Sequence, residues 1–115
     1  MYKKLEELGF FEWLDKVHNL VDTDMKPEYL DRLPLDDIHR TVCNAMAFRW
    51  FREKYNLHAV IIPTITMYWT FKTMTVVEGM VEVPPYNHVD AIDYSTYEQA
   101  MDACIDKLIE LAKRR

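Results

Sequence analysis

An imidazole and a thiol stand four residues apart in a segment with helical spacing. His39 and Cys43 would be neighbours on the helix surface, because residues four apart share a face. Such a pair could be a cysteine nucleophile with its base, or half of a metal site. No matching ligand pair occurs elsewhere, and a zinc site needs three or four ligands. We therefore expect a buried thiol at Cys43, with catalysis or metal binding as the alternative.

A second polar group follows a pair of prolines. His88, Asp90 and Asp93 bring an imidazole and two carboxylates into a predicted loop, and loops often carry functional residues. Aspartate also forms turns that have no function, and a metal-dependent hydrolase needs more convergent carboxylates than this segment offers. We keep His88 and Asp90 as ligand-binding candidates. A small hydrolase or metal-dependent enzyme using His88/Asp90 or His39/Cys43 is the alternative function.

Two arginines of the central helical segment are candidates for binding an anion. Arg49 precedes Glu53 by four residues, so an ion pair at the edge of the core is one interpretation. Arg52 lies close to the same side, and a planar guanidinium suits phosphate or carboxylate groups. We predict that Arg49 and Arg52 contact a small anionic ligand of the nucleotide type, if the protein binds one.

Apolar and less apolar residues alternate along residues 65–72. A period of two predicts a strand with one buried face. The buried set is expected to be Ile65, Met67, Trp69 and Phe71. On the opposite face, Tyr68, Thr70 and Lys72 form a candidate surface for stacking on a ligand or contacting a protein. A face exposed to solvent, or covered by the N-terminal helix, is the alternative.

These residues lie within the one long stretch with β character, residues 57–83. Pro63 is expected to mark a strand end, an edge or a bulge of a first strand, since proline cannot donate to a β-ladder. The apolar residues change parity after Thr73, which predicts a bulge or a twist. Glu78-Gly79 predicts a tight turn into a third strand, residues 80–83, closed by two prolines. We therefore predict a three-stranded antiparallel sheet.

Helical patterns flank the sheet on both sides. Residues 3–20 predict one amphipathic helix with Gly9 as a weak point, and Pro27 predicts a short helix ending at Leu33. The central helix is expected from an N-cap at Asp36 or Asp37 to residue 55 or 56. Its apolar residues cover most of its circumference, so we expect burial on two sides. The second side would meet either the N-terminal helix or a second subunit.

The C-terminal helix is expected to begin with a capping box formed by Ser95 and Glu98. Its inward face would carry Tyr97, Ala100, Met101, Cys104, Ile105, Leu108, Leu111 and Ala112. Its outward face would carry Asp102, Asp106, Glu110 and Lys113.

Composition limits the classes of function. The 115 residues, half of them hydrophobic, are predicted to form a single α+β domain, with residues 1–35 as a helical extension of a core at 36–115. The formal charge of −5 argues against non-specific binding to nucleic acid or to anionic membranes. Two glycines leave no phosphate-binding loop, and no cofactor is expected. Two cysteines on separate helices and no signal-peptide pattern predict reduced thiols and a cytoplasmic location.

Two segments carry a resemblance. Residues 48–58, FRWFREKYNLH, contain K/R-W-[LF]-R-E-x-[HY]-N-[IL], and residues 94–100, YSTYEQA, with Leu108-Ile109, follow Y-x-[ST]-Y-E-[EQ]-A…L-I. Together they resemble a group of small uncharacterised proteins of gut bacteria and their phages, over residues 36–115. The resemblance implies a helix, an antiparallel sheet and a C-terminal helix in this order, and no reaction. It implies a phage accessory protein, a class that often acts by binding.

We therefore predict a non-enzymatic, homo-oligomeric binding protein. It would sequester a small anionic ligand or mask a host protein, as a means of countering host defence.

Overall fold

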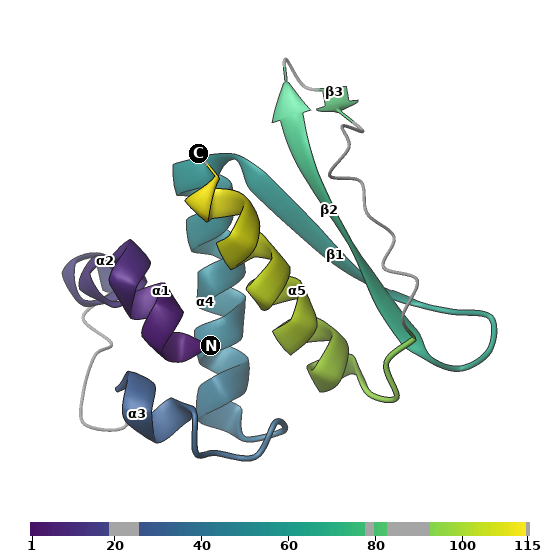
Figure 1. Cartoon of the computed structure of the whole chain (residues 1–115), viewed down its shortest axis with the longest axis horizontal. Coiled ribbons are helices and arrows are strands. Elements are labelled where there is room, and N and C mark those ends of the chain that lie inside the picture. Colours follow the sequence, from purple (N-terminus) through teal and green to yellow (C-terminus); the bar gives the residue numbers. More distant parts are fainter. Residues whose placement is uncertain (19–25, 78–79, 83–92, 115) are drawn as a thin grey trace.

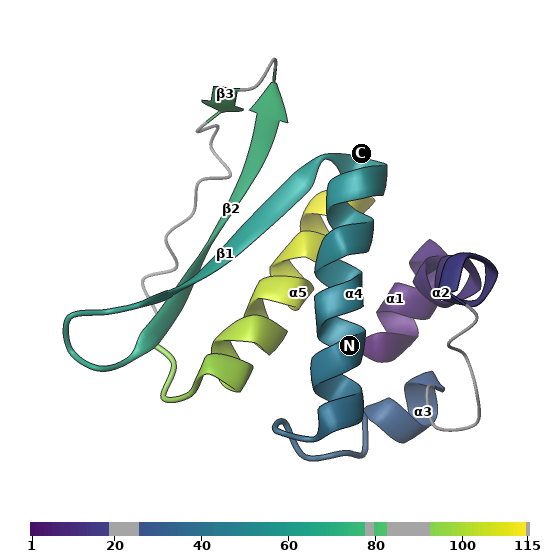
Figure 2. The ribbon, with the colours of Figure 1, turned by 180° about the vertical axis from the view of Figure 1, so that it is seen from behind.

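The computed structural model describes residues 1–18, 26–77, 80–82 and 93–114, and all statements below concern these residues. The elements in chain order are α1 (Tyr2–Leu8), α2 (Phe10–His18), α3 (Pro27–Leu30), α4 (Ile38–Tyr55), β1 (Leu57–Pro63), β2 (Trp69–Val77), β3 (Met80–Glu82) and α5 (Tyr97–Lys113). Helices α4 and α5 lie between the β1–β2 hairpin on one side and α1 and α2 on the other (Figures 1 and 2). The predicted α+β class is confirmed.

The sheet is dominated by one hairpin. β1 and β2 pair antiparallel from Leu57 opposite Thr75 to Pro63 opposite Trp69, so the predicted strand end at Pro63 is confirmed. β3 adds three paired residues beside the end of β2. The packing against α4 and α5 comes from β1 and β2. The helices therefore cover a two-stranded hairpin, whereas we expected them to cover a sheet of three strands.

The start of β2 differs from the prediction. Residues 64–68 form the turn between β1 and β2, in which the Thr64 amide donates to the Tyr68 carbonyl at 2.8 Å. Ile65 and Met67 are 103% and 90% exposed, so the prediction that they belong to the core is wrong. A period of two cannot locate the point at which the chain reverses, because a tight turn can also carry alternating side chains.

Of the bulge or twist predicted after Thr73, the bulge is wrong within the β1–β2 pair, whose register is unbroken, and the twist stays a prediction. The buried face of β2 instead continues from Phe71 through Thr73 and Thr75, which are 2%, 0% and 5% exposed. The change in apolar parity therefore places threonines on the buried face. It does not shift the strand.

The predicted helix at residues 3–20 is divided in two at Gly9. This residue ends α1 with φ 97°, in the left-handed region that glycine adopts at little cost. Helix α2 then turns Phe10 and Leu14 into the same core as Tyr2 and Leu5 of α1. The short helix α3 ends at Leu30, before the expected Leu33.

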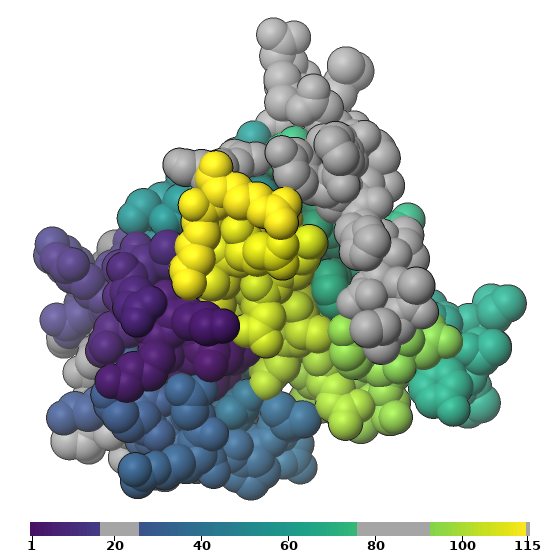
Figure 3. Space-filling view, in the orientation of Figure 1, coloured from purple at the N-terminus to yellow at the C-terminus, as the bar shows by residue number. Residues whose placement is uncertain are grey.

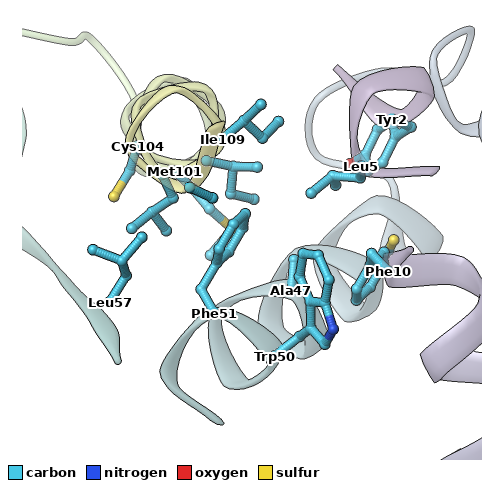
Figure 4. Close-up of a cluster of buried hydrophobic side chains, with 14 of the residues drawn as sticks. Tyr2, Leu5, Phe10, Ala47, Trp50, Phe51, Leu57, Met101, Cys104 and Ile109 are labelled. Carbon is cyan, nitrogen blue, oxygen red and sulfur yellow. The ribbon is translucent and has the colours of Figure 1, made fainter. Parts of the chain in front are cut away.

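The core joins all three layers. The rings of Trp50 and Phe10 lie 5.5 Å apart, and those of Trp50 and Phe51 lie 5.1 Å apart. Figure 4 shows Trp50 facing the N-terminal helices, while Phe51 points toward Met101 of α5. Adjacent aromatic residues of α4 thus serve opposite sides of the core, and α4 is sandwiched between the sheet side and the N-terminal helices.

Caps define both long helices. Asp37 caps α4 by accepting from the His39 amide at 2.8 Å, and Asn56 ends it with φ 53°, as the sequence predicts. The cap of α5 is displaced by one residue. Thr96, not Ser95, accepts from the Gln99 amide at 3.1 Å, and the Gln99 side chain accepts from the Ser95 amide.

Candidate functional site

A buried polar network ties the N-terminal helices to α4 and α5. Arg40, 5% exposed, donates to the Leu30 carbonyl at 3.0 Å and forms an ion pair with Asp102. Asn44 donates to Asp102 at 3.1 Å and accepts from the Tyr2 hydroxyl at 2.6 Å. The guanidinium also lies 5.1 Å from the centre of the Tyr2 ring. This network links α1, the end of α3, α4 and α5.

The network corrects the prediction that Asp102 faces outward. Burial raises the pKa of Asp102, while the Arg40 charge and the bonds from Asn44 and Arg40 act in the opposite direction. Burial likewise raises the pKa of the Tyr2 hydroxyl. Because these groups face one another inside the helical layer, we interpret the network as structural. The available signal in the sequence was that Arg40 and Asn44 share a helix face with Ala47.

The structure separates the roles of His39 and Cys43. The His39 ring lies at the surface with Nδ1 3.2 Å from Asp37 Oδ1, whereas Cys43 is fully buried. Burial raises the pKa of the Cys43 thiol to about 12, so it stays protonated at neutral pH. Cys104 is also free and buried. The expectation of a buried thiol at Cys43 is confirmed.

The arginine candidates lie on the exposed side of α4. Arg49 Nε is 2.9 Å from Glu53 Oε1, and their side chains are 45% and 50% exposed, so this is a solvent-exposed ion pair. Arg52 is exposed as well. Burial of the His58 ring is the larger cause that lowers its pKa, and the positive charge of Arg52 lowers this pKa further. Neither arginine lines the hollows described below.

Two hollows are formed by other residues. One, of about 340 Å³, lies between α2 and the end of α4 and is lined by Gly9, Glu12, Trp13, Lys16 and Lys54. The other, of about 420 Å³, is lined by Lys4, Asp106, Ile109, Glu110 and Lys113.

The first hollow brings one ammonium group near two aromatic rings and a second one beside a carboxylate. Lys54 Nζ lies 5.3 Å from the Trp50 ring centre and 5.5 Å from that of Tyr55, while Lys16 pairs with Glu12 at 3.1 Å. Sequence reasoning missed this arrangement, since the lysines belong to different helices.

The predicted surface of Tyr68, Thr70 and Lys72 does not form. Tyr68 lies in the turn and is 45% exposed, Thr70 is buried, and Lys72 is half-buried. His88 and Asp90 lie outside the described residues.

The turn between β1 and β2, here called the hairpin tip (residues 64–68), instead carries the largest exposure of apolar side chains in the described chain. It projects away from the helices, and Figure 3 shows it as a lobe at the edge of the molecule. Its polar groups bond to one another: the Thr64 hydroxyl accepts from the Tyr68 amide at 3.1 Å and lies 3.0 Å from the Thr66 hydroxyl. Met67 has φ 68°, a conformation that is rare for a bulky residue.

A second exposed apolar surface runs along α4. Ile38 is 71% exposed and Val42 43% exposed, while Ala45 and Arg49 continue the same line. We call these four residues the outer strip. The predicted burial of α4 on two sides is confirmed, because its flanks contact the β1–α5 side and the N-terminal helices. The buried residues form one broad face, and the outer strip lies opposite that face. The buried residues of α4 are Arg40, Cys43, Asn44, Ala47, Trp50 and Phe51.

Comparison with models of protein families, with curated proteins and with solved structures finds no match for this chain. Within the described ranges, no helix is both long and apolar enough to cross a membrane. The same ranges hold no group of three or more histidine, cysteine, aspartate or glutamate side chains arranged to bind a metal ion.

Proposed function

We propose that this chain is a non-enzymatic binding protein that contacts a protein partner through the hairpin tip. The observation that carries the proposal is Met67. This residue holds a left-handed backbone conformation that costs about 1 kcal/mol or more for a non-glycine residue, and its side chain is 90% exposed. A glycine would relieve the strain and a polar residue would remove the apolar exposure. The fold gains nothing visible from methionine at this position.

The turn does not need its apolar side chains. The bonds of Thr64 to Tyr68 and Thr66, and of the Met67 amide to the Thr64 carbonyl at 3.2 Å, hold the loop together. Ile65 beside Met67 is fully exposed. Apolar groups on a loop that is held by polar bonds are preorganised for insertion into an apolar pocket, because little ordering cost remains to be met on binding.

The exposed apolar side chains supply a large part of the energy that a specific contact needs. Burial of an exposed aliphatic side chain contributes about 1.5–3 kcal/mol, so Ile65 and Met67 together offer about 3–6 kcal/mol. The half-exposed Tyr68 ring beside them adds apolar area and a hydroxyl that can bond to the partner. A few such side chains carry most of the free energy in many protein interfaces.

A binding role fits the chemistry of the described residues better than the alternative enzyme does. The Cys43 thiol is buried and protonated, and His39 is engaged with Asp37, so this pair lacks an accessible nucleophile. For the identity of the partner we rely on the resemblance of residues 36–115 to small proteins of gut bacteria and their phages. It supports a bacterial host protein as the target, and interference with host defence as the outcome.

A second candidate is sequestration of a small anionic ligand. The observation in its favour is the hollow between α2 and α4, where Lys16 and Lys54 lie with the Trp13 indole. Two ammonium groups and an aromatic ring suit the phosphates and the base of a nucleotide. This site replaces Arg49 and Arg52 as the place where such a ligand would bind.

The test of the first candidate compares variants of the whole chain in pull-downs from bacterial lysate. Ile65→Thr and Met67→Gly remove the apolar groups, and glycine keeps the positive φ at residue 67. Val60→Thr, on the same hairpin and 46% exposed, is the matched control. We expect a partner to be retained by the wild type and by Val60→Thr, and lost with both tip variants while Tm holds. Retention by both tip variants would rule out the hairpin tip.

The ligand candidate predicts a different result. A mononucleotide or cyclic dinucleotide at millimolar concentration should raise Tm, because a ligand that binds only the folded state stabilises it. Lys54→Gln and Lys16→Gln should abolish the shift, whereas Lys72→Gln should not. If no nucleotide shifts Tm, the ligand candidate is excluded and the protein-partner candidate remains.

A further inference from the structure

The two faces of α4 carry unexpected residues. Its buried face includes Arg40 and Asn44, while the exposed outer strip begins with Ile38 and Val42. Figure 2, seen from behind, has α4 in front, with no described element over its near side. Apolar residues on an uncovered helix face indicate an interaction surface when they form a continuous line.

The outer strip has the spacing of a helix–helix seam. Its four residues and Arg52, which continues the line, follow one another at intervals of 4, 3, 4 and 3 residues: Ile38, Val42, Ala45, Arg49 and Arg52. This alternation of three and four keeps residues on the line along which two helices pack. Ala45 lies at the midpoint, where its small side chain allows close approach of a second helix. At 1.5 Å per residue, α4 is about 27 Å long, which is enough for three such layers.

We propose that the outer strip is the interface of a symmetric homodimer in which α4 packs antiparallel against α4 of a second copy, with the two-fold axis at Ala45. The charges select this occupant. Asp36 and Asp37 lie at the start of α4, and Arg49 and Arg52 lie toward its end. Antiparallel packing brings the acidic start of one copy beside the basic end of the other, and it opposes the helix dipoles. Parallel packing would place like charges together.

The dimer is reversible at micromolar concentrations. A single pair of helices buries less area than the roughly 800 Å² per partner typical of stable complexes. The strip is also interrupted by the Arg49–Glu53 ion pair, whose groups stay partly hydrated. The interface is independent of the proposed function, since the hairpin tip projects from a different side of the molecule (Figures 1 and 2).

Sedimentation velocity of the whole chain, from a few micromolar to several hundred micromolar, tests the state of association. We expect the wild type to shift from monomer to dimer with concentration, and Val42→Lys to raise the dissociation constant at least about tenfold, because each substitution counts twice in a symmetric dimer. Val60→Lys, an equally exposed valine on β1, is the matched control and should leave the dimer unchanged. A monomer at all concentrations, or a dimer insensitive to Val42→Lys, would overturn the proposal.

Two further variants test the orientation. Arg52→Glu should weaken the dimer, and adding Asp36→Arg should restore it, since the reversal recreates opposite charges. For cross-linking, chains carrying Ile38→Cys are mixed with chains carrying Arg52→Cys under mild oxidation. Antiparallel packing predicts disulfide-linked dimers only between the two kinds of chain, while parallel packing predicts links between identical chains. Links between identical chains, or no rescue by charge reversal, would overturn the antiparallel arrangement.

Discussion

Replacing either member of the Arg40–Asp102 pair should destabilise the protein, and replacing both should cost less than the two single changes together. Arg40 is 5% exposed and the Asp102 side chain 21% exposed. Removal of one partner from a buried ion pair costs about 3–5 kcal/mol, because the other charge is left without compensation. Asp102→Leu leaves the deeply buried guanidinium and should cost about that amount. Arg40→Met leaves a carboxylate that water can partly reach, and it should cost about 2–3 kcal/mol.

The double variant buries no charge. Two hydrogen bonds are lost: the one from Arg40 to the Leu30 carbonyl, which keeps its bond from the Leu33 amide, and the one from Asn44 to Asp102. Each loss should cost about 1 kcal/mol or somewhat more. We therefore expect Arg40→Met/Asp102→Leu to cost about 2–3 kcal/mol, which is less than Asp102→Leu alone. The coupling energy between the two positions should therefore be about 4 kcal/mol.

Urea unfolding followed by tryptophan fluorescence measures these free energies, since Trp50 is buried in the core and becomes exposed to water on unfolding. The exposed pair Arg49→Met/Glu53→Leu is the matched control, and its coupling should stay below about 1 kcal/mol. Additive losses at Arg40 and Asp102 would refute the interpretation of the network as a buried, mutually dependent pair. A double variant less stable than Asp102→Leu alone would refute it as well.

Three further outcomes are expected. Burial raises the pKa of Cys43 to about 12 and also raises that of Cys104. Neither thiol should therefore react with a disulfide reagent within minutes at pH 8 until urea unfolds the chain. Rapid reaction in the folded state would contradict their burial. Burial and the Arg52 charge lower the pKa of His58 below its ordinary value of 6.5. The unfolded chain therefore binds more protons, and the free energy of unfolding should fall as the pH drops below 6.5. NMR titration should find the pKa of His58 higher in Arg52→Gln, and an unchanged pKa would exclude the Arg52 charge as a cause. Gly9→Ala should lower the free energy of unfolding by about 1–2 kcal/mol, and Gly9→Asn by less, because φ is 97° at this position. Steric clash is not the cause, since an added Cβ would meet nothing nearer than Lys54 Nζ at 3.9 Å. Equal losses for alanine and asparagine would exclude backbone strain as the reason.

The sequence by itself determined the elements whose signals are local. Asp37 and Asn56 mark the ends of α4 because a capping side chain or a left-handed residue acts within one turn of the helix. β1 ends at Pro63, a residue that is typical of strand ends and edges because it cannot donate to a ladder. The α+β class followed from a helical pattern on each side of one β-rich stretch. The cap of α5 was misplaced by one residue because serine and threonine stand side by side at its start.

Only the tertiary structure decided which side of each element is buried. Residues on most of the circumference of α4 are apolar, so local spacing could not show that Arg40 would face inward and Ile38 outward. That orientation depends on the contact of Arg40 with Asp102, 62 residues away in the sequence. The hairpin tip was hidden for a similar reason, because Ile65 and Met67 continue the alternation of β2. The pairing of Pro63 with Trp69 leaves them in the turn between the strands. The hairpin tip and the outer strip therefore share one property. The local sequence pattern assigns their apolar residues to the core, whereas the long-range packing leaves these residues exposed.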